Sequence, residues 1–292
     1  IRNDKGEVEA KQCTLNGGEL PLASWGSMAQ LADTCNGYPA LPADISDSVG
    51  PISAFSLLVD KESNEQVISA EAVYYIYGFG PENSQYQVPP WTVPTAIASR
   101  GTTSAAGLLL AKSVGIPLNH PLYGTTCTPN PAYPGSKGPN DVNTNGAMIT
   151  FVNEAAAAGN AQATLGFAST ETVDAKRDKV KSLAFQAKDQ EWGYWPDSDQ
   201  TTSYDKINVR EGRYWLWNPH HFYGKLNGPN GAHIDPNAEL WIKYITGKEP
   251  LPDGKSFLEI QANVGNIPQC AMQVTLSGSL ASTTCAWRVG SN

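Results

Sequence analysis

A unit of strand, loop and helix at residues 95–114 constrains the fold of this chain more than any other feature. The run "TAIASR" (95–100) is typical of a short buried strand, "GTTS" follows as a loop, and "AAGLLLAKSV" has the composition of an apolar helix. In α/β proteins the loop of such a unit commonly contacts ligands. Strands and helices also alternate elsewhere, which predicts the α/β class. Further strands are expected within 51–60, 163–170, 178–187 and 212–224, and helices at 69–78, 147–158 and 236–247.

The polar residues around this loop have two interpretations. Ser and Thr often cap helix N-termini, so Ser99, Thr102, Thr103 and Ser104 are compatible with a simple cap. Alternatively, their hydroxyls, the amides of the helix N-terminus and the guanidinium of Arg100 converge on an oxyanion. For this motif taken alone, a helix cap is the commoner arrangement. The choice between a cap and an oxyanion site therefore depends on the rest of the sequence.

Composition limits the classes of partner. The chain has 292 residues and a formal net charge of −8, with no basic run, so nucleic acid is not expected to bind. Only 16% of residues are charged, which is typical of many secreted bacterial proteins. No apolar run has the length needed to span a bilayer. No signal peptide stands at Ile1, so we expect a mature chain or one that begins partway through its gene product.

The cysteines indicate an oxidising compartment. Cys13 and Cys35 flank a turn-rich segment, and Cys270 and Cys285 flank a hairpin-like one. Proximity favours the disulfides Cys13–Cys35 and Cys270–Cys285, although four cysteines allow three pairings. Cys127 is then expected to be unpaired. Local bridges of this kind are typical of extracytoplasmic proteins.

Motifs for catalysis are missing from the sequence. It contains no Gly-x-Ser-x-Gly, no Gly-x-Gly-x-x-Gly and no phosphate-binding P-loop, so neither an enzyme nor a cofactor is expected. His220 and His221 are adjacent, and adjacent residues on a strand point to opposite faces, so a shared metal is not expected. The aromatic segment 192–223 could stack on sugars or form an interaction surface, but aromatic residues are more often core residues.

Three segments, in order, carry a family resemblance: "ISAEAVYYIYGFG", "VPTAIASRGTTSAAGLLLAKSVGIP" and "NTNGAMITFVNEAAAAGNAQATLGFAST". Together they resemble the phosphate-binding proteins of ABC transporters, within the type 2 periplasmic binding protein superfamily. The resemblance covers roughly residues 50–275. It implies a two-lobed α/β fold with a ligand cleft between the lobes. Residues 1–52 and 209–292 would form the first lobe, incomplete at its N-terminus, and residues 53–208 the second.

The resemblance also implies site residues. Arg100 matches the family's phosphate-contacting arginine and Ser104 its loop serine, whereas Ala105 and Ala106 replace a Gly-Thr pair. The expected ligand-binding residues are therefore Ser99, Arg100, Thr102, Thr103 and Ser104. In the first lobe, Met28 and Ala29 stand where the family has an aspartate.

Two functions from different classes follow. The first is a secreted or periplasmic protein that binds phosphate or a related oxyanion between its lobes and catalyses no reaction. Its expected partner is a transporter or a cell-surface protein. The alternative is an extracellular structural or adhesive protein that keeps the fold around a vestigial site.

Overall fold

The computed structural model describes residues 24–27, 42–100, 104–116, 140–142, 144–276 and 285–287. Its strands are β1 (Ser24–Ser27), β2 (Ile45–Asp60), β3 (Val67–Ser69), β4 (Ala98–Ser99), β5 (Asn140–Asp141), β6 (Gly166–Ser169), β7 (Val180–Ser182), β8 (Ala184–Gln186), β9 (Trp217–Lys225), β10 (Val274–Leu276) and β11 (Cys285–Trp287). Its α-helices are α1 (Ala70–Phe79), α2 (Ala105–Val114), α3 (Asn145–Ala155), α4 (Thr170–Asp174), α5 (Ile207–Arg210), α6 (Pro236–Ile245) and α7 (Phe257–Asn263). Shorter helical turns lie at Pro94–Ala96, Ala156–Asn160, Ala161–Ala163 and Gln269–Ala271.

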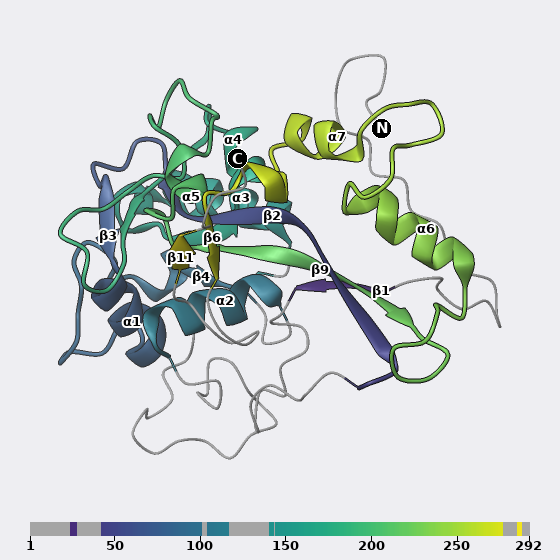
Figure 1. Cartoon of the computed structure of the whole chain (residues 1–292). Coiled ribbons are helices and arrows are strands. Elements are labelled where there is room, and N and C mark those ends of the chain that lie inside the picture. The colour runs from purple at the N-terminus through teal and green to yellow at the C-terminus, as the bar shows by residue number, and fades with distance from the viewer. Residues whose placement is uncertain are drawn as a thin grey trace.

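The long strand β2 organises the sheet. It pairs antiparallel with β9 along its first half and with β6 and β7 along its second half, and β1 adds to the outer side of β9. In Figure 1, β2 and β9 run together from a large body, which holds α1 to α5, toward a smaller part beside α6 and α7. The structure is thus α/β, as predicted, and its two-part arrangement agrees with a two-lobed fold.

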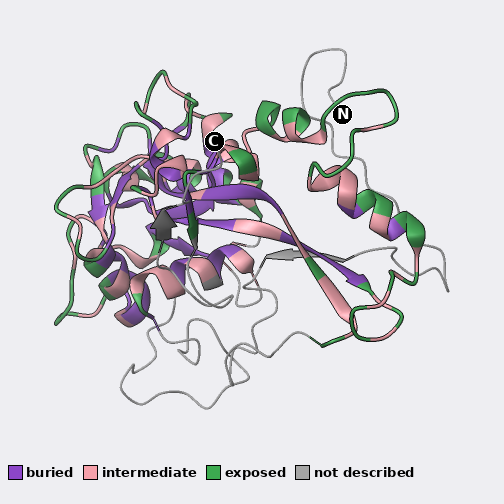
Figure 2. Cartoon of the chain, in the orientation of Figure 1, coloured by how far each residue is buried: buried purple, intermediate pink, exposed green. Residues whose placement is uncertain are grey.

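The burial of β2 explains its role in the core. Residues 50–60 are buried except for Phe55, because helices cover both faces of the strand there. Leu57 and Val59 face one core cluster with α1 and α2, whereas Leu58 faces a second cluster with α3. Figure 2 shows the buried stretch of β2 inside the large body. Such continuous apolar runs are typical of strands covered on both faces.

Helix boundaries follow the local sequence signals. Ser69 caps α1 by accepting a hydrogen bond from the Ala72 amide, and α2 ends at Gly115, which has a φ of 79°. That left-handed conformation costs glycine little, which is why it often ends helices. The predicted strand at 95–100 is shorter in the structure, because a 3₁₀ turn occupies Pro94–Ala96 and only Ala98–Ser99 pair with β5.

The division into lobes at residues 52 and 208 stays a prediction. The larger core cluster joins residues from both of the predicted lobes. Val209, Tyr214, Ile267 and Val274 pack in it together with Leu57.

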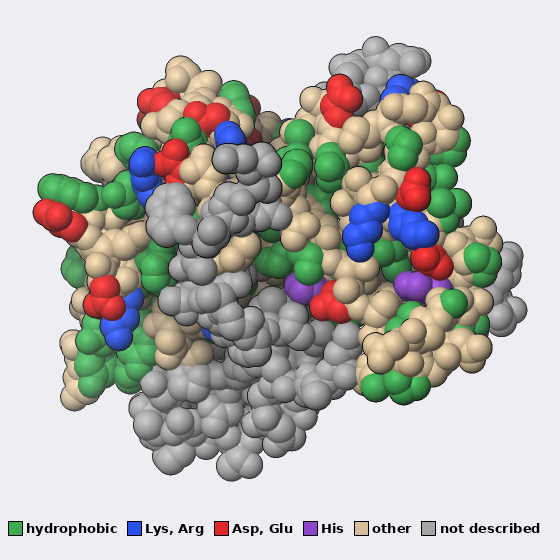
Figure 3. Space-filling model, viewed as in Figure 1, with side chains coloured by type: hydrophobic (Ala, Val, Ile, Leu, Met, Phe, Trp, Pro, Cys, Tyr) green, Lys and Arg blue, Asp and Glu red, His purple; other side chains and the backbone are tan. Residues whose placement is uncertain are grey.

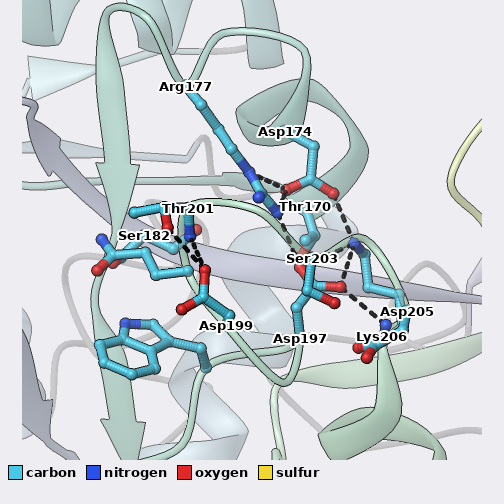
Figure 4. Close-up of polar contacts among 12 residues, drawn as sticks. Thr170, Asp174, Arg177, Ser182, Asp197, Asp199, Thr201, Ser203, Asp205 and Lys206 are labelled. Atoms are coloured by element: carbon cyan, nitrogen blue, oxygen red, sulfur yellow. Dashed lines mark hydrogen bonds and ion pairs between the residues drawn. The ribbon is translucent and has the colours of Figure 1, made fainter.

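A buried ion cluster fixes α4 to the loop that precedes α5. Lys206 Nζ lies 2.6 Å from Asp174 and 2.9 Å from Asp197, and Arg177 Nη2 lies 2.7 Å from Asp174 and 3.0 Å from Asp197 (Figure 4). The Tyr204 ring stacks on Arg177. Each carboxylate therefore contacts two cations, which is the pairing that buried charges require. Burial raises the pKa of Asp197, and the charge of Lys206 opposes that effect.

The predicted Cys270–Cys285 disulfide is wrong. β10 and β11 form the expected antiparallel pair, but the residue opposite Cys285 is Leu276. Cys270 lies before β10 in the turn Gln269–Ala271 and is an exposed free thiol. Cys13, Cys35 and Cys127 lie outside the described residues, so their pairing stays a prediction.

Replacement of Lys206 by Met should destabilise the protein by about 3–5 kcal/mol, because two carboxylates would keep a single buried cation. Urea unfolding followed by circular dichroism measures the change. Lys243→Met is the matched control, since the Lys243–Glu239 pair is exposed to solvent and should contribute little to the stability. Equal effects of the two variants would contradict the assignment of Lys206 to a buried cluster.

Cys270 should react with a thiol reagent such as DTNB in the folded, unreduced protein, because its side chain is exposed and free. Cys270→Ser should remove one equivalent of reactive thiol. A non-reduced peptide map that links Cys270 to Cys285 would contradict this prediction.

Candidate functional site

Three strands, β4, β6 and β2, bring polar residues to one edge of the sheet. β4 runs parallel to the start of β6, with Ile97 opposite Leu165, and β2 runs antiparallel to β6, with Phe55 opposite Ser169. The carboxyl ends of β4 and β6 and the Ser53 side of β2 therefore meet at the same edge. We call this region, with the residues that follow β4 and β6, the polar edge. Ligands of α/β proteins commonly bind at such edges.

A hydrogen-bonded chain links three elements at the polar edge. Arg100 Nη1 donates to Asn145 Oδ1 at 2.9 Å, and Asn145 Nδ2 donates to Ser169 Oγ at 2.6 Å. The Ser169 amide also donates to Asn145 Oδ1 at 3.3 Å, and the hydroxyls of Ser169 and Thr172 lie 3.0 Å apart. Asn145 thus uses both ends of its amide to hold the guanidinium next to the first turn of α4.

The N-terminus of α3 lies at the polar edge, and α2 begins at Ala105, shortly after Arg100 in the chain. Ser104 stands at the N-terminus of α2, and its hydroxyl makes no capping hydrogen bond to the described first turn. Thr144 caps α3 by accepting from the Ala147 amide at 3.1 Å, which fixes Asn145 as the first residue of that helix. The simple cap interpretation therefore fails for the Ser104 side chain, while the amides at the start of α2 keep their partial positive charge.

The predicted site residues are only partly within the described chain. Ser99 is buried, and its carbonyl accepts a hydrogen bond from the Val142 amide at 2.9 Å. Thr102 and Thr103 lie outside the described residues. The structure adds Asn145 and Ser169 next to Arg100, which sequence reasoning missed. The run "NTNG" before α3 was the available signal, since Asn and Thr are typical of helix N-termini.

A second polar chain lies on the crossing strands. Ser53 Oγ is 2.5 Å from His220 Nε2 and donates to Asn266 Oδ1 at 3.1 Å, while Asn266 Nδ2 donates to Gln261 Oε1 at 2.7 Å. This chain joins β2 and β9 to the segment that follows α7.

His221 points to the other face of β9, as the alternation of strand side chains predicts. Its Nδ1 lies 2.7 Å from Asp47 Oδ1 and 2.9 Å from Asp47 Oδ2. The two histidines thus have separate partners, both on β2. Within the described ranges, no three His, Cys, Asp or Glu side chains gather in a way that could hold a metal ion.

Burial changes the titration of two groups near the polar edge. It lowers the pKa of His220 to about 4, with a smaller contribution from the charge of His221. Burial also raises the pKa of Glu171 in the first turn of α4, and a hydrogen bond from Ser169 opposes that rise. His220 is therefore neutral at pH 7.

Surface charges on the face seen in Figure 3 are scattered, and Lys and Arg side chains do not gather there into a basic surface. Among the described residues, no helix combines the length and the apolar composition required to cross a membrane.

The free energy of unfolding should fall between pH 6.5 and about pH 4, by up to about 1.4 kcal/mol per pH unit. Because the folded pKa of His220 lies below its unfolded value of 6.5, the unfolded chain takes up the proton first as the pH falls. Urea titrations across this range measure the slope. His220→Gln keeps a polar partner for Ser53 and should flatten the slope; an unchanged slope in this variant would contradict the buried neutral state.

Comparison with known proteins finds similarity in fold only. No family model matches the chain, and no curated protein matches it. Solved structures that resemble it include an ABC-type phosphate transport receptor from Vibrio cholerae, with 17% identity over 78% of this chain and 74% of that chain and a TM-score of 0.48. Another is a putative phosphate ABC transporter substrate-binding protein with bound phosphate from Clostridium perfringens, with 15% identity, 77% and 72% coverage and a TM-score of 0.49. A possible phosphate binding protein from Planctomyces limnophilus has 11% identity, 77% and 67% coverage and a TM-score of 0.47.

Proposed function

We propose that the chain is an extracytoplasmic solute-binding protein that holds phosphate or a related oxyanion at the polar edge, without chemistry. The observation that carries the proposal is the chain Arg100–Asn145–Ser169, which holds a guanidinium and a serine hydroxyl at the first residue of α3. The helix α2 begins shortly after Arg100 in the chain. Charge-assisted hydrogen bonds to a guanidinium and helix amides are the usual means of binding an oxyanion.

The proposed contacts are the Arg100 guanidinium, the hydroxyls of Ser99, Thr102, Thr103 and Ser104, and the amides at the start of α2. The neutral amide of Asn145 supports this assignment, because it orients Arg100 without supplying a negative charge of its own. A transporter or a cell-surface protein would be the macromolecular partner, and secretion fits the small charged fraction of 16%.

A second function is an extracellular structural or adhesive protein with a vestigial site. Two observations favour it. Asn145 already accepts one of the guanidinium donors, and Ala105 and Ala106 offer no hydroxyl at the start of α2. In that case no anion would bind in a saturable way.

Isothermal titration with phosphate and with sulfate tests the proposal. The wild-type protein should bind at least one of them, and Arg100→Ala should weaken binding by on the order of 2–5 kcal/mol, the cost of removing one partner of a buried charged pair. Asn145→Asp should abolish binding, because it places a carboxylate 2.9 Å from the guanidinium.

The control is Arg213→Ala, which removes a guanidinium that is paired with Glu211 and largely exposed. It should bind as the wild type does. Saturable binding that survives both Arg100→Ala and Asn145→Asp would contradict the proposed site, and a wild-type protein that binds neither anion would favour the structural function.

A further inference from the structure

We infer that Asn145 is a site of self-modification, at which the backbone nitrogen of Gly146 displaces the side-chain amide and leaves an aspartate or an isoaspartate. The reaction needs water as its only co-reactant, and Asn145, Gly146, Arg100 and Ser169 supply its geometry. The effect of this modification on anion binding rests on the function proposed above, whereas the reaction itself does not.

The attacking group is the backbone nitrogen of Gly146, the second residue of α3. Amides of the first helical turn have no acceptor within the helix, and the Gly146 amide donates to no described residue. Gly146 is exposed, and beyond its chain neighbours and the helix backbone no atom lies within 4 Å of the place of a Cβ. Hydroxide can therefore reach the amide proton, and no side chain blocks the nitrogen.

The side-chain carbonyl of Asn145 is activated by two hydrogen-bond donors. Its Oδ1 accepts from Arg100 Nη1 at 2.9 Å and from the Ser169 amide at 3.3 Å. Negative charge develops on Oδ1 as the nitrogen adds to Cγ, and these donors stabilise that charge as an oxyanion hole does. The positive end of the dipole of α3, a helix of 11 residues, also favours loss of the proton from the Gly146 amide.

Atoms and charges balance in this reaction without an oxidant or a reductant. A bond forms between Gly146 N and Asn145 Cγ, and the bond between Cγ and Nδ2 breaks. Nδ2 leaves as ammonia with the proton from the Gly146 amide. Water then opens the cyclic imide, at Cγ to give aspartate or at the main-chain carbonyl to give isoaspartate.

The product replaces a neutral amide at the polar edge by a carboxylate. An aspartate keeps an acceptor for Arg100 and for the Ser169 amide, and its charge is favourable in the first turn of α3, which has no acidic residue. The guanidinium is then paired within the protein, as in the Asn145→Asp variant. Anion binding is therefore lost as the chain ages.

Other Asn–Gly pairs of the described chain serve as internal references. Asn227–Gly228 and Asn230–Gly231 lie in the turn that follows β9. No donor among the described residues contacts either side-chain amide, and the Gly231 amide is itself engaged, since it donates to the Gly228 carbonyl at 3.1 Å. These pairs lack the two donors that activate Asn145.

Incubation of the folded protein at mildly alkaline pH in water enriched in heavy oxygen tests the inference. Digestion in ordinary water and peptide mapping by mass spectrometry then count only the label that entered before digestion. The Asn145 peptide should gain one labelled oxygen at least as fast as the Asn227 peptide. Arg100→Ala should slow labelling at Asn145 on the order of tenfold, because one donor to Oδ1 is lost, and leave Asn227 unchanged. Arg213→Ala is the matched control and should change neither rate.

Gly146→Ala separates the reaction from the fold of the site. The variant keeps Asn145 and its hydrogen bonds, and the structure has space for the added methyl group. Because alanine restricts the backbone and hinders the attacking nitrogen, labelling at Asn145 should slow by roughly tenfold or more. Phosphate binding of aged samples should fall in proportion to the labelled fraction in the wild type and persist in Gly146→Ala.

The outcomes distinguish this inference from the proposed function. An Asn145 peptide that stays unlabelled while the Asn227 peptide is converted would overturn the inference, as would equal labelling at Asn145 in the wild type and in Arg100→Ala. Undiminished phosphate binding by labelled protein would overturn the claim that the new carboxylate occupies Arg100. If fresh wild-type protein binds no anion, the proposed function fails, and the labelling still decides the modification.

Discussion

Every feature of the polar edge depends on the pairing of one strand, β2, with β9 on one side and β6 on the other. This strand has 16 residues, more than any other in the described chain, and its buried half belongs to the core of the large body. Its register against β6 sets Ser53 beyond Ser169, and its pairing with β9 brings His220 to Ser53 and His221 to Asp47. A shift of one residue would move each of these side chains to the other face, so burial of Leu57 and Leu58 fixes the site as well as the core.

The buried ion cluster secures the other half of the site. α4 has only five residues and could not be stable alone. Asp174 at its end is held by Lys206 and Arg177, and Thr170 at its start is held by the hydroxyl of Ser56 at 3.0 Å. The position of Ser169, and through it the position of Asn145 and Arg100, therefore depends on charges that are remote from the proposed ligand. Asp197 belongs to this cluster, and Asp199 accepts hydrogen bonds from the amides of Thr201 and Thr202.

Sequence reasoning predicted the class, the order of the elements and the place of Arg100 directly after a strand, because these depend on local signals. Apolar runs, the Ser69 cap and glycines such as Gly115 mark the elements without knowledge of their neighbours. Asn145, Ser169 and the Ser53–Asn266 contact were not predicted, because they depend on which strands pair and in what register. The Cys270–Cys285 disulfide was predicted from closeness in sequence and is wrong for the same reason. The register of β10 and β11 determines which residue lies opposite Cys285, and that residue is Leu276. The Asn145 amide in particular could not be distinguished from an ordinary residue of a helix N-terminus.

The central claim is that Arg100, Asn145 and the N-termini of α2 and α3 form one anion site. Backbone and arginine side-chain ¹H–¹⁵N NMR spectra, recorded during a titration with phosphate at constant pH, test it most directly. The account predicts saturable shifts, with one common dissociation constant, for the Arg100 side chain and for the amides of Ala105, Ala106, Asn145 and Ser169. Shifts that grow linearly with phosphate and are confined to exposed lysines and arginines, with the Arg100 signal unmoved, would contradict it.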